Sequence, residues 1–242
     1  MAVSSTRTDN RILSALPAAE YRKLTAKMKR VQLKLREGVS AAGKRMTHVI
    51  FPESALISTV STMKNGATIE VGVTGREGMA GLPLLLEGGV APTDSFVQVP
   101  GEGVRMSAED FRREVTPNTT LYRLLLRYTQ AFLDQTSQFA ACNRLHGLSQ
   151  RCARWLLMTH DQVGGPDLAL THEFLAQMLG VRRAGVSEAV GALARKGLIK
   201  SSRGKVSLLD VPGLEEASCE CYFLIRAVWE RLLPAGRVHS GA

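Results

Sequence analysis

The sequence predicts an α+β chain in three parts: an N-terminal antiparallel β-barrel or jelly roll, a long helix, and a C-terminal winged helix-turn-helix. Three observations predict this order. Short β-rich segments fill residues 31–106, an apolar heptad runs through 121–142, and a glycine joins two amphipathic stripes within 174–193. We expect residues 1–115 to form the β-rich domain with N-terminal helices, 116–145 the long helix, and 146–242 the winged helix-turn-helix domain.

The N-terminal part has helical spacing over residues 10–28, broken by Pro17, and then changes to short strands. Residues 31–35 alternate apolar and polar side chains, as a half-buried strand does. The dipeptide Asn65-Gly66 joins two β-rich runs at 57–63 and 68–73, which is the strongest short hairpin signal in the chain. Several such strands predict a small barrel or jelly roll; the others lie at 48–51, 96–99 and 104–106.

A long helix is predicted to begin at Thr116-Pro117, with the threonine as N-cap and the proline in the first turn. Seven side chains along it are spaced alternately four and three residues apart, as in a coiled coil. The favoured interpretation is a parallel pair across a dimer axis, and the alternative is burial of this seam against the chain's own domain. The seam consists of Leu121, Leu125, Tyr128, Phe132, Gln135, Phe139 and Cys142.

Further helices are expected beyond a break at residues 144–147. An amphipathic helix over 148–163 ends at Gly164-Gly165-Pro166, where the glycines and the proline cannot continue it well. A final helical segment is expected at 213–233. The helix-turn-helix lies between these two segments.

Two short apolar stripes predict the helix-turn-helix. The first includes Phe174 and Leu175, the second includes Val186 and Val190, and Gly180 lies between them, where the chain must turn sharply. With the second stripe facing inward, the opposite face of that helix can enter a major groove. This outward face comprises Arg183, Ala184, Ser187, Glu188 and Gly191, with Arg182 at the helix entrance.

A basic hairpin, or wing, is expected to follow. Apolar runs at 198–200 and 205–209 flank a polar turn at 201–204. Residues 182–205 hold seven basic side chains against one acidic, a formal charge of +6 that a phosphate backbone would favour. The alternative is a helical corner that only packs. The candidate contacts to double-stranded DNA are Thr171, His172, Arg182, Arg183, Ala184, Ser187, Glu188, Arg203 and Lys205.

Composition agrees with an ordinary globular protein of 242 residues, 45% hydrophobic and 22% charged, with a formal charge of +9. Most of the positive excess lies in the first 45 residues, where it is expected to serve mainly solvation. No run of 18 apolar residues predicts a membrane span, and the start lacks the apolar core of a signal peptide, so we expect a cytoplasmic protein. No hydrolase elbow, zinc-protease motif or Walker loop is present, and no enzymatic turnover is expected.

The order of these parts resembles the Crp/Fnr family of bacterial transcription regulators. The motifs that carry the resemblance are 51–54 (Phe-Pro-Glu-Ser), 65–66 with 70–72, 75–79 (Gly-Arg-Glu-Gly-Met), 97–102 and the helix-turn-helix. The resemblance implies a homodimer that binds a near-palindromic operator and contacts RNA polymerase. It implies that residues 1–115 are a sensor domain, 116–145 a dimerisation helix and 146–242 a DNA-binding domain. It also implies base contacts by Arg182, Arg183, Ser187 and Glu188. Ala184 stands where relatives of the cyclic-AMP receptor carry glutamate, so a different operator is expected.

The sensor departs from the family pattern for cyclic nucleotides. Members that bind them hold the phosphate with an arginine and the ribose with a glutamate, whose places fall near Thr93-Asp94 and Gly81 here. Residues 77–104 contain no Arg or Lys, and burying a phosphate without a cation is costly. Backbone amides leave that possibility open. We expect an unidentified effector or none; the candidate pocket residues are Gly78, Met79, Ala80, Gly81, Leu82, Thr93 and Asp94.

The four cysteines are too few for a disulfide framework, and the first, Cys142, lies too late for the family's N-terminal iron–sulfur ligands. Cys219 and Cys221 would point about 200° apart on a helix but would share a face on an extended segment. Structural cysteines are favoured over metal binding or redox sensing, so no metal site and no cofactor are expected. The alternative function is a ligand- or redox-sensing module with vestigial DNA binding.

Overall fold

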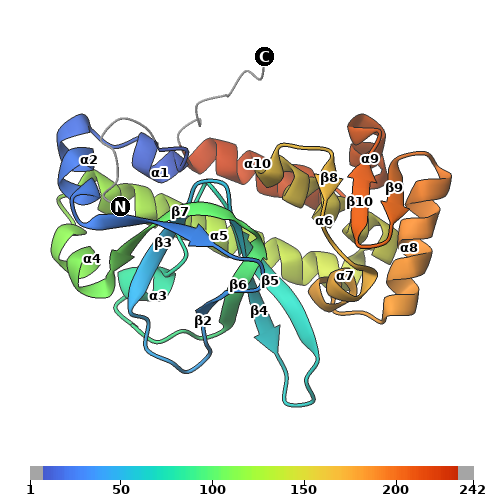
Figure 1. Cartoon of the computed structure of the whole chain (residues 1–242), viewed down its shortest axis with the longest axis horizontal. Helices are drawn as coiled ribbons and strands as arrows, with labels where there is room; N and C mark the ends of the chain where they lie inside the picture. Colours follow the sequence, from blue (N-terminus) through green and yellow to red (C-terminus); the bar gives the residue numbers. More distant parts are fainter. Residues whose placement is uncertain (1–7, 234–242) are drawn as a thin grey trace. The chain divides into compact units, whose positions relative to one another are not determined.

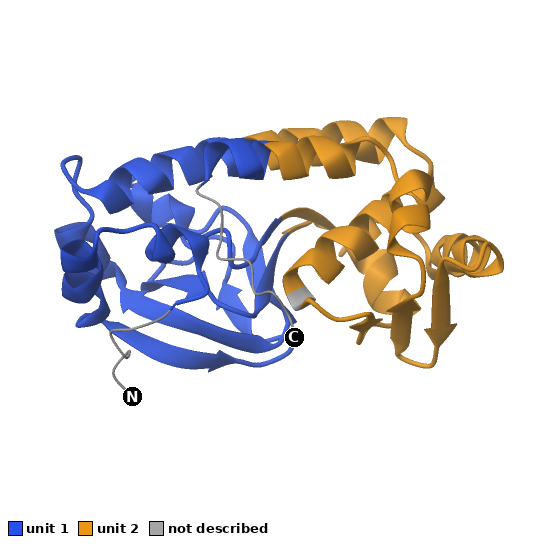
Figure 2. Ribbon diagram, turned by 90° about the horizontal axis from the view of Figure 1, so that it is seen from above, with its two compact units in different colours: residues 1–59, 73–133, 228–242 blue, residues 60–72, 134–227 orange. Residues whose placement is uncertain are grey.

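The structure is a computed structural model that describes residues 8–233. Contacts between residues divide the chain into two compact units (Figure 2). Unit 1 holds residues 1–59, 73–133 and 228–242, and unit 2 holds 60–72 and 134–227. This division separates the long helix into two parts and groups residues 60–72 with the C-terminal half of the chain, unlike the sequence boundaries at 115 and 145.

The first sheet is antiparallel and follows two short helices, α1 (Arg11–Ser14) and α2 (Ala18–Thr25) (Figure 1). Its strands are β1 (Met28–Leu33), β7 (Gly101–Ser107) and β3 (His48–Pro52), in the order β1-β7-β3. Met28 lies opposite Met106, and Val49 lies opposite the same residue from the other side. β7 is therefore the central strand.

The second sheet has the order β2-β6-β4-β5. Its strands are β2 (Gly38–Ser40), β6 (Asp94–Val99), β4 (Leu56–Thr62) and β5 (Thr68–Thr74). Apolar side chains from both sheets share one core, made of Leu33, Ile50, Ala55, Ile57 and Val97. The two sheets do not join into a closed ladder in the described part of the chain, so of the two predicted forms, barrel and jelly roll, the arrangement is the jelly-roll-like one.

Three short elements of this region were not predicted: β2, α3 (Leu82–Leu85) and α4 (Ala108–Glu114). Each has at most seven residues, which is too short for a clear period. The start of α4 nevertheless has a local signal, because the Ser107 hydroxyl accepts a hydrogen bond from the Asp110 amide.

The long helix α5 spans Thr120–Leu145 and begins later than the predicted Thr116-Pro117. Its first amides are satisfied from elsewhere: the Glu20 carboxylate of α2 accepts from the amides of Thr120 and Leu121, at 3.2 and 2.9 Å. Thr119 Oγ1 accepts from the Tyr122 amide. Because a distant carboxylate and Thr119 cap the helix, the N-cap expected at Thr116 was wrong.

The heptad seam of α5 is buried within the chain, which corrects its assignment as the dimer interface. Leu121, Leu125 and Tyr128 are fully buried, Gln135 and Phe139 nearly so, and only Phe132 is half-exposed. A helix that packs against its own domain needs the same period as one that pairs with a copy, so the spacing could not separate the two.

Unit 2 contains the remaining elements, except that the last helix of the described chain continues into unit 1 from residue 228. The predicted helix 148–163 is confirmed as α6 (Leu148–Val163), and Gly164 ends it in the left-handed conformation. The prediction of one continuous helix over 213–233 was wrong, because Ser218 is extended and separates two helices, α9 and α10. None of the helices in the described residues is long and apolar enough to cross a membrane. The other elements are β8 (Asp167–Leu168), α7 (His172–Leu179), α8 (Arg183–Arg195), β9 (Ile199–Ser202), β10 (Lys205–Leu208), α9 (Val211–Ala217) and α10 (Cys221–Leu232).

The tip of the β4–β5 hairpin belongs to unit 2 and packs on its helices. The turn lies at Asn65-Gly66, as predicted, and is closed by a hydrogen bond from the Met63 amide to the Ala67 carbonyl. The Trp155 indole donates to the buried Glu70 carboxylate at 3.0 Å. The side chain of Ile69 lies against Gly180, so this hairpin reaches the turn of the helix-turn-helix.

We expect Gly180→Ala to destabilise the protein more than Gly197→Ala does. Both glycines have positive φ, at 64° and 75°, a backbone that costs alanine about 1–2 kcal/mol. Only at Gly180 would the new Cβ lie 2.7 Å from Ile69 Cδ1, whereas nothing lies within 4 Å at Gly197. Urea unfolding measures the free energy of unfolding of each variant. Adding Ile69→Ala to Gly180→Ala should recover part of the stability that Gly180→Ala loses. Equal losses at the two glycines would contradict the packing of Ile69 on this turn.

Candidate nucleic-acid interface

The helix-turn-helix corner is formed by α7 and α8, as the stripes predicted. Thr171 caps α7 by accepting from the Phe174 amide, and Gly180 ends it in the left-handed conformation. The buried Arg151 guanidinium donates to the carbonyl of Leu179, one of the last in α7. The inward face of the corner is made of Leu175, Ala176, Met178, Leu179, Val186, Ala189, Val190 and Leu193, all buried.

The opposite face of α8 is exposed. Arg182 precedes the helix in an extended conformation and begins it without a side-chain cap. Arg183, Ala184, Ser187 and Glu188 are all exposed within the first two turns. The four residues predicted to contact bases, Arg182, Arg183, Ser187 and Glu188, are thus all exposed at the start of α8.

The wing is a tight hairpin of β9 and β10, with Arg203-Gly204 as its two-residue turn. Gly204 has a φ of 76°, which such turns require. Arg203 and Lys205 are exposed, but Lys205 Nζ lies 2.7 Å from the carboxylate of Asp167 on β8. This ion pair, together with a hydrogen bond from Ser207, lowers the pKa of Asp167. Arg203 is consequently the better placed cation for a phosphate.

His172 connects α8 to the wing through two hydrogen bonds. Its Nδ1 hydrogen-bonds with Ser187 Oγ of α8 at 3.0 Å, and its Nε2 with Ser201 Oγ of β9 at 3.2 Å. The sequence identified His172 and Ser187 as separate DNA contacts and missed Ser201. No local signal pairs these residues, because they lie 15 and 29 positions apart.

A cavity of about 360 Å³ lies in unit 1, where residues of α3 and α5 form part of its wall. Five of the seven predicted pocket residues line it: Met79, Ala80, Gly81, Leu82 and Thr93. The other two do not line it. Gly78 lies against the ring of Tyr128, and Asp94 accepts a hydrogen bond from the Ala42 amide at 2.9 Å.

The wall of this cavity is largely apolar. Met46, Leu86, Phe132 and Leu133 contribute to it, and hydroxyl groups such as that of Thr74 supply its polar atoms. Among the described residues, no lysine or arginine lines the cavity. An anionic group placed here would therefore lack a cation to pair with.

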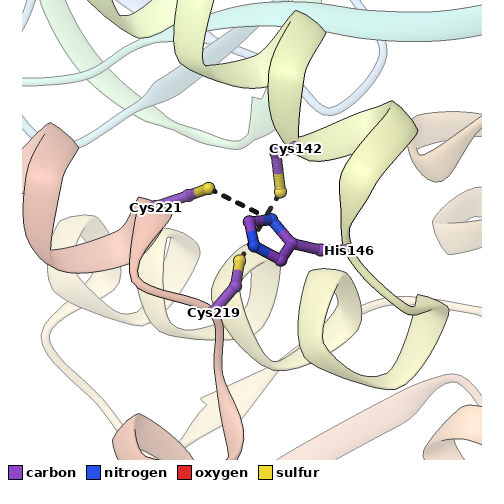
Figure 3. A group of neighbouring side chains, drawn as sticks. All are labelled: Cys142, His146, Cys219 and Cys221. Carbon is purple, nitrogen blue, oxygen red and sulfur yellow. Dashed lines mark hydrogen bonds between the residues drawn. The ribbon is translucent and has the colours of Figure 1, made fainter.

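A second feature of unit 2 is a cluster of Cys142, His146, Cys219 and Cys221, drawn in Figure 3. The three cysteines are buried together. The Cys142 and Cys219 sulfurs lie 3.5 Å apart, and their hydrogen bond lowers the pKa of Cys142 and raises that of Cys219. The sequence considered Cys219 and Cys221 alone and missed Cys142 and His146 as their neighbours.

Comparison with known proteins agrees with this geometry. Residues 150–217 match the family model of the Crp-like helix-turn-helix domain. The transcriptional regulator SdrP of Thermus thermophilus is 42% identical over 59 residues, which are 24% of this chain and 29% of SdrP. The aligned part thus spans less than a third of that relative.

Solved structures show the same fold across most of the chain. FixK2 of Bradyrhizobium japonicum aligns with a TM-score of 0.67 at 14% identity, covering 79% of this chain and 98% of that one. TTHA1359, a CRP/FNR family transcriptional regulator from Thermus thermophilus, aligns with a TM-score of 0.61 at 22% identity, covering 78% and 98%. The chain therefore carries a Crp-like helix-turn-helix domain within the fold of the Crp/Fnr family of transcriptional regulators.

Proposed function

We propose that this protein is a transcription regulator that binds a near-palindromic operator as a homodimer. The exposed face of α8 beside a basic wing is the observation that carries the proposal. In this proposal, residues 146–242 bind DNA, residues 116–145 form the dimer and residues 1–115 sense a signal. The protein acts through binding and through contact with RNA polymerase, and not as an enzyme.

Each part of the interface has a role that its chemistry suits. The Arg182 and Arg183 guanidinium groups can donate two hydrogen bonds to guanine in the major groove, and Glu188 can accept from cytosine. Arg203 on the wing suits a phosphate. Thr171 and His172 lie at the start of α7, where backbone amides favour an anion. His172 also holds Ser187 and Ser201, so it keeps the α8 face and the wing in one geometry.

The dimer in this proposal uses the outer face of α5 in place of the buried seam. Leu126 and Leu133 lie seven residues apart, hence on one face, and are 44% and 57% exposed; Leu133 also lines the cavity beside α5. An exposed apolar stripe on a helix is costly unless a partner covers it. A second copy placed on a two-fold axis would cover both stripes at once.

The effector of this regulator is proposed to be apolar or neutral, and not a cyclic nucleotide. The cavity offers apolar walls and scattered hydroxyl groups, and the described residues that line it include no cation. The same cavity favours one alternative, a ligand-sensing module whose DNA binding is vestigial. Selecting bound sequences from a random DNA pool separates the two, because a vestigial reader would enrich no sequence.

We expect Arg183→Ala to weaken specific binding by about 1–3 kcal/mol and to relax base preference at one position of each half-site. The reason is loss of a bidentate contact to a base edge. Competition binding with single-base operator variants measures both effects. Arg22→Ala, which removes the same charge from an exposed position on α2, should change neither. Unchanged base preference in Arg183→Ala would contradict the assignment of α8 to the groove.

Arg203→Ala should weaken binding to all sequences alike and lower the salt slope by about one. Lys205→Ala should have a smaller effect, because Asp167 already pairs with that ammonium group. Titrations at several salt concentrations, with specific and random DNA, test both variants. A base-selective loss at Arg203 would count against phosphate contact by the wing.

Leu126→Glu should convert the dimer into monomers at micromolar concentration, because it places a charge at the centre of the proposed interface. Sedimentation velocity measures the change. Leu35→Glu is the matched control, since Leu35 is 52% exposed and lies outside α5. If Leu126→Glu remains dimeric, the interface lies elsewhere.

A further inference from the structure

Four potential metal ligands meet at the end of α5 (Figure 3). Cys142 lies in the last turn of α5, and His146 follows one helical turn later, with its amide bonded to the Cys142 carbonyl. Cys219 lies in the extended link after α9, and Cys221 is the first residue of α10. The pair Cys142 and His146 and the pair Cys219 and Cys221 therefore meet, although they lie far apart in the sequence.

The distances fit a single ion. The three sulfurs and one ring nitrogen all lie within 4.8 Å of one another. Cys142 Sγ is 3.5 Å from Cys219 Sγ, and Cys221 Sγ is 3.4 Å from His146 Nδ1. Around zinc, with Zn–S bonds of about 2.3 Å, the edges of a tetrahedron of ligands are about 3.8 Å long. Small side-chain movements would bring the observed ligand–ligand distances to this tetrahedral value.

The surroundings of the cluster are those that orient metal ligands. His146 Nε2 lies 3.1 Å from the Glu220 carboxylate, so this nitrogen carries the proton and Nδ1 presents its lone pair to the sulfurs. The Gln138 amide donates to Cys221 Sγ at 3.0 Å, as an outer donor does to a metal-bound thiolate. A carboxylate–histidine pair of this kind typically fixes the tautomer of a zinc ligand.

Charge makes a separate argument. The residues Arg151 and Arg154 are 7% and 2% exposed, and no carboxylate of the described residues lies within 4.0 Å of either guanidinium group. Both interact electrostatically with Cys142. Burying two cations is costly unless negative charge lies near them. Three thiolates around a divalent ion supply one net negative charge at this place.

We propose that Cys142, His146, Cys219 and Cys221 bind one Zn²⁺ ion in a closed tetrahedral site. With four protein ligands, no position is left for water or substrate, so the ion has a structural role. It ties the end of α5 to the start of α10 across more than seventy residues of sequence. Zinc binding is then coupled to the folding of unit 2.

The test uses the full chain, purified without a chelator and with any affinity tag removed. Elemental analysis should find one zinc ion per chain in the wild type and in Cys152→Ala. Cys152 is the control because it is buried in α6 and outside the cluster. Cys142→Ser and Cys221→Ser should lose the ion. Glu220→Gln should keep the fold and bind zinc about 10–100-fold more weakly.

A second measurement does not depend on variants that fold. Wild-type protein stripped with a chelator and given Co²⁺ should show the intense visible absorption of a tetrahedral thiolate site, and Zn²⁺ should abolish it. Stripping should also lower the Tm, which added zinc restores. A metal-free protein with a Cys142–Cys219 disulfide would overturn the proposal in favour of a redox pair. Four reduced thiols that bind neither metal would overturn it as well.

Discussion

One face of α5 has to be buried along its whole length, and much of the chain is arranged to bury it. In unit 1 the Tyr128 ring stacks on Trp229 at 5.6 Å, and its hydroxyl hydrogen-bonds with Thr74 at 3.0 Å. In unit 2 the Arg154 guanidinium covers the Phe139 ring at 4.3 Å. Side chains of each unit thus pack against the part of α5 that belongs to that unit. A helix used in this way cannot also present that face to a second copy, so the dimer proposed above uses exposed side chains of α5 outside the seam.

In the proposed regulator, an effector in the cavity would contact the same helix. Tyr128 and Thr129 of α5 line the cavity, together with Thr59 of β4 and Thr74 of β5. Each of these three elements continues into unit 2, where Glu70 of β5 accepts a hydrogen bond from Trp155. A ligand shifts a conformational equilibrium only by its differential affinity for the two states. Because the cavity wall includes elements that continue into unit 2, an effector bound there would contact elements that both units share.

Much of the fold could be predicted from the sequence, and the errors have identifiable physical causes. The Asn65-Gly66 hairpin, α6 and the inward stripe of α7 and α8 follow from short-range periodicity, which the sequence displays directly. The start of α5 was misplaced because Glu20, a hundred residues away, provides the cap. The cysteine cluster was missed because its two halves are local pairs with an ordinary structural explanation. Only the tertiary fold shows that they meet.

The cluster also bears on the geometry of the DNA-binding corner through Arg151. Burial lowers the pKa of this arginine, and negative charge at Cys142 and Cys219 acts in the opposite direction. The guanidinium of Arg151 donates to the Leu179 carbonyl at the end of α7, next to the Gly180 turn that sets the angle between α7 and α8. Anionic sulfur nearby lowers the cost of burying a charged arginine in that position. An occupied metal site would therefore stabilise the cap of α7, whereas neutral thiols would leave that cap with an uncompensated buried cation.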